Sequence, residues 1–405
     1  MSTDRSPIRS AILNLGVNGI AQVAAKGLGD PDIVPLWFGE SDLVTPKFIS
    51  DAAKEALDAG KTFYSGQRGI LPLREALSAF HKRMVGADVA VERISIPGAA
   101  TLAMVTALQC LIETGDNVVI VSPIWPSIFE ASLVVGAEIR FARLEEDWQA
   151  GKWRLDMDRL FAQCDARTRA IFVCSPGNPT GAVMPLEEWR TLFELSDRHG
   201  FAIASDECYS EIYFAPEGQA PLGALDAAKQ LGRSDFRNLL VFTSLSKRSN
   251  VPGLRSGFVA GDAALVKAFL HYRTYHGSAM SPVVQAASEA AWRDEAHVRE
   301  NREQYRRKFA QVTPMLAGKL DVRLPDAGFY LWAGIPSHLH GGDDVAFALG
   351  LLAQYNVTVL PGSLLARPSR GANPGAGRIR LALVAETAEC VEAAERILAY
   401  IQDIS

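Results

Sequence analysis

The 405-residue sequence lacks the features that would place a protein in a membrane or on nucleic acid. No segment approaches the run of about eighteen apolar residues that a membrane-spanning helix needs. Residues 1–7 are polar and contain no apolar core, so they do not predict a secretory signal. The net charge of −5 gives no general attraction to nucleic acid or to an anionic membrane. We therefore expect no nucleic-acid partner and no membrane partner.

Cysteine and histidine are also scarce. The five cysteines are scattered along the chain and include no C-x-x-C pair, which disfavours a disulfide framework and indicates free thiols in a reducing compartment. We therefore expect a cytoplasmic protein. The neighbouring His338 and His340 have no third ligand close by in the sequence, so we expect a solvated loop there and no metal site.

The chain is long enough, and at 48% hydrophobic apolar enough, to form a large core and two domains. Short runs rich in β-branched residues alternate with helical periodicity such as that of residues 186–199. This alternation predicts an α/β fold, with a mostly parallel sheet and helices on both faces. The expected strands of this sheet include residues 94–98, 117–121, 169–174, 201–205, 239–243 and 257–260.

The sequence changes character after Pro282. Residues 283–319 predict a long charged helix with one interruption near Pro314, and a final helix is expected at residues 388–401. Short strands are expected between them, at residues 322–324, 328–332, 357–359 and 378–381. We predict a large domain at residues 46–289 and a smaller α+β domain formed by residues 290–405 together with residues 1–45.

Residues 244–257 are the segment around which the rest of the chain is organised. They follow a buried strand, supply the hydroxyl groups of Ser244 and Ser246, and then present Lys247 and Arg255. Ligands of open α/β sheets bind outside the carboxyl ends of the strands, which is where these side chains are expected. An amine partly removed from water loses its proton more readily and can attack a carbonyl to form a Schiff base.

Other interpretations of this segment exist. Lysine and arginine are usually solvated surface residues, so Lys247 and Arg255 alone prove little. Residues 244–247 also match the S-x-x-K motif of serine β-lactamases, but the chain supplies neither the S-D-N nor the K-T-G element that those enzymes need. That class is therefore disfavoured.

Four segments, in this order, carry a specific resemblance. They are residues 175–181 (SPGNPTG), residues 205–209 (SDECY), the pattern S-x-S-K-x5-G-x-R-x-G at residues 244–257, and residues 378–380 (RIR). With them the sequence resembles the fold type I pyridoxal-phosphate enzymes of the class I/II aminotransferase family over nearly its whole length. The second half is similar to N-succinyldiaminopimelate aminotransferases, whereas the first half is less so.

The resemblance implies a set of residues that hold the cofactor ring. Lys247 would bind the cofactor aldehyde and later shuttle a proton, and Asp206 would pair with the pyridinium nitrogen. Asn178 and Tyr209 would hydrogen-bond the phenolate oxygen of the ring, and Trp125 would stack on its face. Without the resemblance, an aspartate at a strand end is often only a helix cap, and a lone tryptophan is more often core packing.

The resemblance also implies how charged groups are bound. The cofactor phosphate would be held by Arg255, by the hydroxyl groups of Ser244 and Ser246, and by the backbone N–H groups of Ala99 and Ala100. On the residues alone, residues 98–101 could equally form a plain tight turn. Tyr64 would join this set from a neighbouring subunit, which implies a homodimer. Arg380, aided by the backbone of Gly39, would clamp the α-carboxylate of the substrate.

We expect a ping-pong aminotransferase that moves an amino group from an L-amino acid to a 2-oxo acid such as 2-oxoglutarate, with pyridoxal 5'-phosphate as cofactor. Succinyl-diaminopimelate, aspartate and aromatic amino acids are the candidate substrates, and the sequence leaves the choice among them open. A β-lyase with the same cofactor is an alternative because a fold does not fix its chemistry. A cofactor-binding regulatory module is a second alternative, disfavoured because no basic DNA-binding segment is present.

Overall fold

The computed structural model describes residues 7–16, 19–24, 26, 29–147, 151–277, 279–369 and 371–405. The expectation about a secretory signal concerns residues 1–7, of which 1–6 lie outside the described part of the chain. Within the described residues, no helix is both long and apolar enough to span a membrane.

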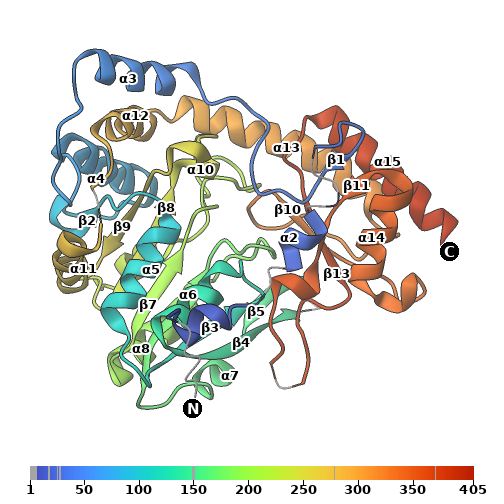
Figure 1. The fold of residues 1–405 in the computed structure, drawn as a ribbon, viewed down its shortest axis with the longest axis horizontal. Helices are drawn as coiled ribbons and strands as arrows, with labels where there is room; N and C mark the ends of the chain where they lie inside the picture. Colours follow the sequence, from blue (N-terminus) through green and yellow to red (C-terminus); the bar gives the residue numbers. More distant parts are fainter. Residues whose placement is uncertain are drawn as a thin grey trace.

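A central sheet of eight strands organises the larger part of the molecule (Figure 1). Its five middle strands, from β8 to β4, are parallel, whereas β9, β2 and β5 join at the edges through antiparallel pairings. The strands in spatial order are β2 (Ile94–Ser95), β9 (Gly257–Gly261), β8 (Leu239–Ser244), β7 (Ala202–Asp206), β6 (Thr168–Cys174), β3 (Asn117–Ser122), β4 (Glu138–Asp147) and β5 (Lys152–Leu155).

Alternate residues of the central strands enter two separate cores, because successive side chains of a strand point to opposite faces of the sheet. Val119, Ile171 and Ile203 belong to one core, and Val118 and Phe172 belong to the other. The first core is covered by α4 (Leu71–Val85), α8 (Leu186–His199), α9 (Ala224–Gln230) and α12 (Pro282–Arg293), and the second by α5 (Ala100–Leu111), α6 (Ser127–Val135) and α11 (Ala263–His276). The predicted α/β fold class is thus confirmed.

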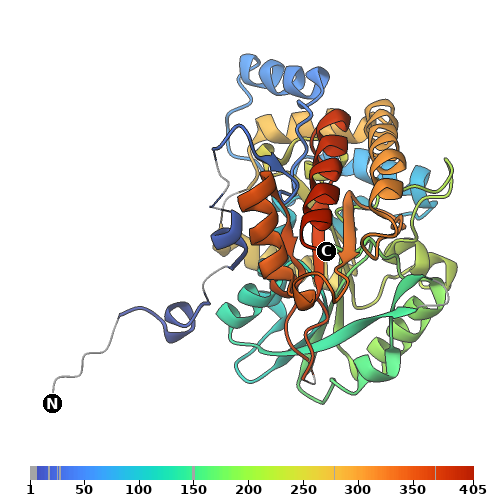
Figure 2. The same cartoon turned by 90° about the vertical axis from the view of Figure 1, so that its right-hand side faces the viewer.

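A third core lies beside the sheet and is built mainly from the end of the chain. Its helices are α13 (Ala296–Leu316), α14 (Asp344–Tyr355) and α15 (Thr387–Asp403), and Figure 2 shows α14 and α15 side by side. Val34 and Leu36 join this core from the beginning of the chain. Its strands are β10 (Tyr330–Gly334), β13 (Arg378–Ala382) and β12 (Leu360–Pro361), which are antiparallel, and the parallel pair β1 (Val34–Pro35) and β11 (Val357–Thr358).

The remaining helices are short, except for α3 (Lys47–Asp58), which packs on α12. They are α1 (Ser10–Leu13), α2 (Gly19–Ala24), α7 (Met157–Phe161) and α10 (Leu245–Arg248), with 3₁₀ turns η1 (Val91–Arg93), η2 (Pro252–Leu254), η3 (His340–Gly342) and η4 (Gly362–Leu365). The grouping of early and late residues in the third core agrees with the predicted small domain, but the domain limits themselves stay a prediction.

The long charged helix was predicted with its interruption in the wrong place. The break falls at Asp294, whose backbone is extended and whose carboxylate accepts a 2.9 Å hydrogen bond from the backbone N–H of His297. This side chain therefore caps the start of α13, in the manner of an N-cap aspartate. Pro314 lies within the last turn of α13, where the missing N–H costs a single backbone hydrogen bond.

The strand predicted at residues 322–324 is absent from the structure. Its neighbour Asp321 forms an isolated bridge to Gly334, but residues 322–325 have no ladder partner, and apolar character alone does not make a strand. Conversely, the β4–β5 hairpin was not predicted, because β4 is half-buried and largely polar along its length. A weak alternation of this kind gives no clear strand signal.

His81 on α4 makes the stability of this fold sensitive to acid. Its ring is buried at 5.3 Å from that of Phe258, and Nε2 has no hydrogen-bond partner among the described residues. Burial lowers the pKa of His81 from 6.5 to about 4. The unfolded chain therefore binds this proton first, and the stability falls as the pH drops from 6.5 towards 4.

We expect the lowered pKa of His81 to reduce the free energy of unfolding by about 3 kcal/mol when the pH falls from 7 to 4. Urea unfolding at both pH values should show that His81→Phe removes most of this loss, whereas the exposed His271→Phe control retains it. An equal acid sensitivity in His81→Phe and in the unsubstituted protein would contradict the assignment.

Candidate active site

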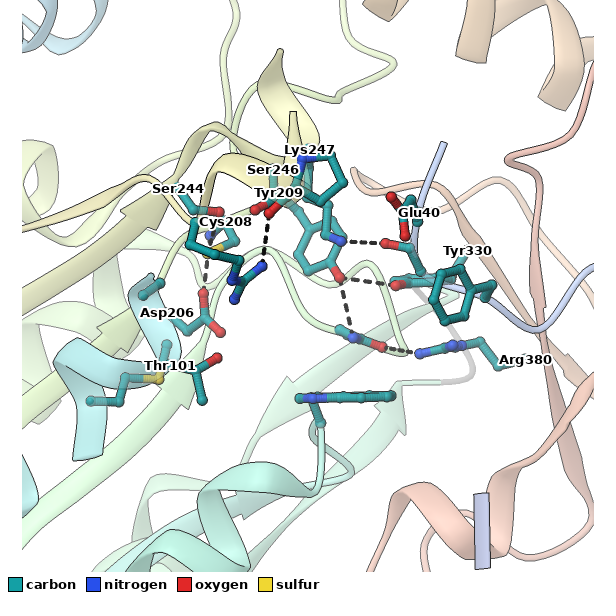
Figure 3. A pocket seen from close by; sticks show the side chains of 18 of the residues that line it. Glu40, Thr101, Asp206, Cys208, Tyr209, Ser244, Ser246, Lys247, Tyr330 and Arg380 are labelled. Atoms are coloured by element: carbon teal, nitrogen blue, oxygen red, sulfur yellow. Dashed lines mark hydrogen bonds between the residues drawn. The ribbon is translucent and has the colours of Figure 1, made fainter. Parts of the chain in front are cut away.

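A cavity of about 290 Å³ opens at the carboxyl ends of β6, β7 and β8 (Figure 3). Side chains from β10 and β13 and the segment around Gly39 close its other side. The cavity lies where ligands of open α/β sheets bind. Except for Ala99 and Tyr64, all of the predicted site residues line it: Gly39, Ala100, Trp125, Asn178, Asp206, Tyr209, Ser244, Ser246, Lys247, Arg255 and Arg380.

Lys247 lies on α10, the single helical turn that follows β8. Its Nζ donates a hydrogen bond to the backbone oxygen of Gly39 and lies 5.7 Å from the centre of the Phe329 ring. Burial lowers the pKa of the Lys247 amine, and this effect outweighs the nearby Cys208 and Glu40, which raise it; the charges of Arg380 and Arg255 also lower it. The amine is therefore more easily deprotonated than a surface lysine, which is what a nucleophile needs.

Asp206 ends β7, the strand next to β8, and so reaches the same edge of the sheet as Lys247. Figure 3 shows Asp206 and Arg380 on opposite sides of the cavity, with Lys247 and Tyr209 between them. Burial raises the pKa of the Asp206 carboxyl, whereas hydrogen bonds from Cys208 and the charge of Lys247 lower it. The backbone N–H of Cys208 lies 3.1 Å from the carboxylate. A cation placed against Asp206 would stabilise its ionised form.

Tyr209 connects the two sides of the cavity. Its hydroxyl group lies 2.9 Å from that of Tyr330 and accepts a 3.3 Å hydrogen bond from the side-chain amide of Asn178. Burial raises the pKa of Tyr209 well above its ordinary value, and the neighbouring Tyr330 raises it further. The hydroxyl group therefore stays protonated and is able to donate a hydrogen bond to an anionic oxygen in the cavity.

Arg380 is fully buried on β13, with 1% of its surface exposed. Its guanidinium donates to the side-chain oxygen of Asn178 at 2.9 Å and to the backbone oxygen of Trp37 at 2.7 Å. It also lies 4.1 Å from the centre of the Tyr330 ring, and its Nε has no partner within the described residues. A buried guanidinium without a carboxylate partner, facing a cavity, is suited to bind an anionic ligand.

The opposite end of the cavity is built for a second anion. Residues 98–100 turn from the end of β2 into α5, whose first N–H groups have no partner within the helix. Gly257 lets this turn pack against β9, because a Cβ there would lie 2.8 Å from the Gly98 oxygen and 3.0 Å from the Ala100 nitrogen. The exposed guanidinium of Arg255 and the hydroxyl group of Ser244 line the same cavity.

The residues 31–397 match the family model of aminotransferase class I and II. This chain belongs to the class I and II aminotransferases. The predicted family, the enzyme class and the aminotransferase function are therefore confirmed, while the preferred substrate stays open. Enzymes of this family depend on pyridoxal phosphate and use amino acids and oxo acids as substrates.

The similarity to individual relatives covers nearly the whole aminotransferase chain. It is 30% identical to the LL-diaminopimelate aminotransferase of Nitratidesulfovibrio vulgaris strain DP4, over 97% of each chain. The structure of an aminotransferase from Neisseria meningitidis Z2491 is 44% identical, with a TM-score of 0.88 over 97% of this chain and 99% of the other. N-succinyldiaminopimelate aminotransferase from Mycobacterium tuberculosis shares the fold, at 24% identity and a TM-score of 0.87 over 97% and 100% of the two chains.

Two predicted residues of the aminotransferase site lie apart from the cavity. Ala99 precedes α5 and does not line the cavity, although Ala100 beside it does. Tyr64 lies in the loop before α4 with its side chain fully exposed, at 108% of the reference area. A role of Tyr64 in phosphate binding requires a second copy of the chain, so it stays a prediction.

Several lining residues were not predicted, and Tyr330 is the most prominent of them. It begins β10 and is buried between Tyr209 and Gly39, such that a Cβ on Gly39 would lie 2.7 Å from the Tyr330 hydroxyl oxygen. The sequence of residues 328–332 predicts a strand but gives no signal for which aromatic residue faces the cavity. The other unpredicted lining residues are Trp37, Phe38, Glu40, Thr101, Met104, Cys208 and Pro252.

His338 and His340 do not belong to a metal site: within the described residues, no three potential metal ligands come together. His340 instead lies with Nε2 2.6 Å from the hydroxyl oxygen of Tyr400, so it contributes to the packing of α15. The five cysteines are all free thiols. Cys208 lines the cavity beside Ser244, and burial raises its pKa well above the ordinary value, which makes it a poor nucleophile.

Proposed function

We propose that the cavity binds pyridoxal 5'-phosphate covalently through Lys247 and transfers amino groups between an L-amino acid and a 2-oxo acid. The observation that carries the proposal is the half-buried amine of Lys247 between the carboxylate of Asp206 and the buried guanidinium of Arg380. The donor set fits the cofactor, because a carboxylate, an amine and two anion-binding ends occur together in a cavity of suitable size.

When bound, the cofactor supplies a carbonyl group for the amine and an aromatic ring that accepts electrons from the substrate. Asp206 would keep the ring nitrogen protonated, and Tyr209 and Asn178 would hydrogen-bond the phenolate oxygen. Trp125 would cover one face of the ring. Lys247 would be the base that takes a proton from Cα and returns it, since its lowered pKa suits that task.

The two ends of the cavity would hold the two anionic groups. The phosphate would meet Arg255, Ser244 and Ser246 and the N–H groups of Ala99 and Ala100 at the start of α5. Arg380 and the backbone of Gly39 would hold the α-carboxylate of the amino acid at the other end. This separation would orient the substrate along the cavity, with Lys247 between its two ends, and orientation is a large part of catalysis.

The finer substrate identity is part of the proposal. 2-Oxoglutarate is the proposed acceptor, and succinyl-diaminopimelate, aspartate and aromatic amino acids are the proposed donors. The LL-diaminopimelate aminotransferase among the relatives supports including diaminopimelate compounds in the panel. We also propose a cytoplasmic location, supported by the scattered free thiols, and a homodimer in which Tyr64 reaches the neighbouring phosphate site.

The test begins with purified protein and pyridoxal phosphate. We expect an absorbance band of lysine-bound cofactor, and borohydride reduction should fix the cofactor mass on the peptide that carries Lys247. Amino acids should then transfer their amino group to 2-oxoglutarate. Release of ammonia and pyruvate from single amino acids would instead indicate the β-lyase, and a protein that stays colourless with added cofactor would refute the proposal.

The shared site has its own test. If Tyr64 acts across a dimer, Tyr64→Ala and Lys247→Ala subunits should each be impaired, and their mixture should regain activity. A mixed dimer contains one site with both Lys247 and the partner's Tyr64 intact. Mixing that restores nothing, in a protein that sedimentation shows to exchange subunits, would place Tyr64 outside the site.

A further inference from the structure

The helix that carries Lys247 is too short to be stable by itself. α10 spans Leu245–Arg248, and the N–H of Ser249 closes its single turn on the oxygen of Leu245 at 3.0 Å. Isolated helices need about 12–15 residues even with favourable sequences, and the last carbonyl groups of any helix lack partners within it. Contacts with other elements must therefore fix the backbone from which the Lys247 side chain extends.

Asn301 of α13 makes the most direct of these contacts. Its side-chain amide nitrogen donates to the backbone oxygen of Lys247 at 3.1 Å and to that of Arg248 at 3.4 Å. Its side-chain oxygen accepts a 3.1 Å hydrogen bond from the amide group of Asn250. Asn301 is buried and does not line the cavity, so it contacts the backbone of Lys247 from outside the site.

His297, one turn earlier on α13, makes a second contact. Its Nε2 lies 2.8 Å from the hydroxyl oxygen of Ser249, and its Nδ1 lies 2.6 Å from the carboxylate of Asp294. The order serine, histidine, aspartate is that of a hydrolytic triad. Ser249 has none of its surface exposed and does not line the cavity, so no substrate can reach it, and the group acts as a structural connection.

Arg248 supplies the third contact. Its buried guanidinium donates to the backbone oxygen of Ala291 and to the carboxylate of Glu295, both at 2.8 Å, and lies 4.5 Å from the centre of the Trp292 ring. The three residues that follow Lys247 are thus each bonded to α13 or to its junction with α12, which Figure 1 shows beside α10.

We propose that Asn301 and His297 are positioning residues for Lys247. They hold the backbone of α10 so that the amine points at the Gly39 oxygen and at the edge of the sheet where Asp206 lies. The inference deepens the proposed function and rests on it, because the position of the amine determines how fast it captures the cofactor carbonyl. A displacement of about 1 Å is enough to slow a positioned reaction by as much as 10²-fold.

The test compares Asn301→Ala with Asn117→Ala. Asn117 is also buried and its side chain also hydrogen-bonds within the protein, to Asp165 and Thr168, but it lies at the amino end of β3, away from the cavity. Protein freed of cofactor is mixed with pyridoxal phosphate, and its attachment to Lys247 is followed by borohydride trapping and mass spectrometry. The pH midpoint of the absorbance change of the lysine-bound cofactor and the Tm without cofactor are measured in parallel.

We expect Asn301→Ala to slow attachment at least about tenfold and to move the pH midpoint, because the amine leaves its place. Asn117→Ala should lower Tm without either effect. Ser249→Ala is the second variant, because it removes one hydroxyl group and opens little space. It should also slow attachment and move the pH midpoint, so it tests the inference even if Asn301→Ala fails to fold. If Asn301→Ala and Ser249→Ala both attach the cofactor at the rate and with the pH midpoint of the unsubstituted protein, the inference is overturned while the proposed function stays intact. An unsubstituted protein that never attaches the cofactor at Lys247 would overturn both.

Discussion

Lys247→Ala is expected to yield a folded protein that attaches no cofactor and transfers amino groups about 10⁴-fold more slowly, the upper range for loss of a positioned base. The substitution removes two functions of the Lys247 side chain. The covalent anchor is removed, and no other described amine lines the cavity to move the proton at Cα. The measurement is borohydride trapping of the cofactor, combined with the rate of a single turnover with an amino acid in excess.

Lys308→Met is the matched control for this prediction. Lys308 lies on α13, is more deeply buried than Lys247, and donates to the backbone oxygen of Val384 at 2.9 Å. Burial lowers the pKa of Lys308 as it does that of Lys247, but Lys308 does not line the cavity. A covalent cofactor that survives in Lys247→Ala, or that disappears in Lys308→Met, would show that desolvation and not the neighbourhood of Asp206 selects the reactive amine.

Much of the site could be predicted because it lies at one edge of a parallel sheet. Asn178, Asp206 and Lys247 each follow a strand recognisable by its apolar run, and the carboxyl ends of parallel strands meet at the same edge. The position of these residues in the chain was therefore enough to bring them together. Their chemical types, an amide, a carboxylate and an amine, then limited what the edge could bind.

The residues that close the cavity could not be predicted in this way. Trp37 and Glu40 follow β1, which has only two residues, and they reach the site because β1 pairs with β11 more than 300 residues later. Tyr330 and Arg380 lie on neighbouring strands whose register decides which side chains face inward. A shift of the register by one residue would turn both side chains outward, and no local pattern specifies that register.

The anchoring of α10 was hidden for a different reason. Residues 248–250 have polar side chains that look suited to a solvated loop, and their partners on α13 lie about fifty residues later. The break before α13 depends on the Asp294 side chain as a cap, which a continuous charged helical pattern conceals. Buried polar pairs of this kind become visible only when the two elements are placed against each other.

Arg380→Met is the second substitution with a large expected effect. Met is similar in length and apolar, so the buried space stays filled while two charge-assisted hydrogen bonds to the substrate carboxylate are lost. We expect kcat/KM for an amino acid to fall about 10³-fold, which corresponds to about 4 kcal/mol at 1.5–3 kcal/mol per bond. Cofactor attachment to Lys247 should persist, because Arg380 lies on the opposite side of the cavity from Asp206.

The specific readout is the discrimination between alanine and ethylamine, which differ by the carboxylate. Asn178 and the Trp37 oxygen already hold the guanidinium in place, so the unsubstituted enzyme spends little binding energy on ordering it. Arg380→Met should therefore react with the two amines at rates much closer to each other. Arg380→Lys should discriminate between the two amines more than Arg380→Met and less than the unsubstituted enzyme, because an ammonium keeps the charge but not the planar fork. Equal losses for both amines would mean that Arg380 acts through Asn178 on the cofactor end of the cavity and not on the substrate carboxylate.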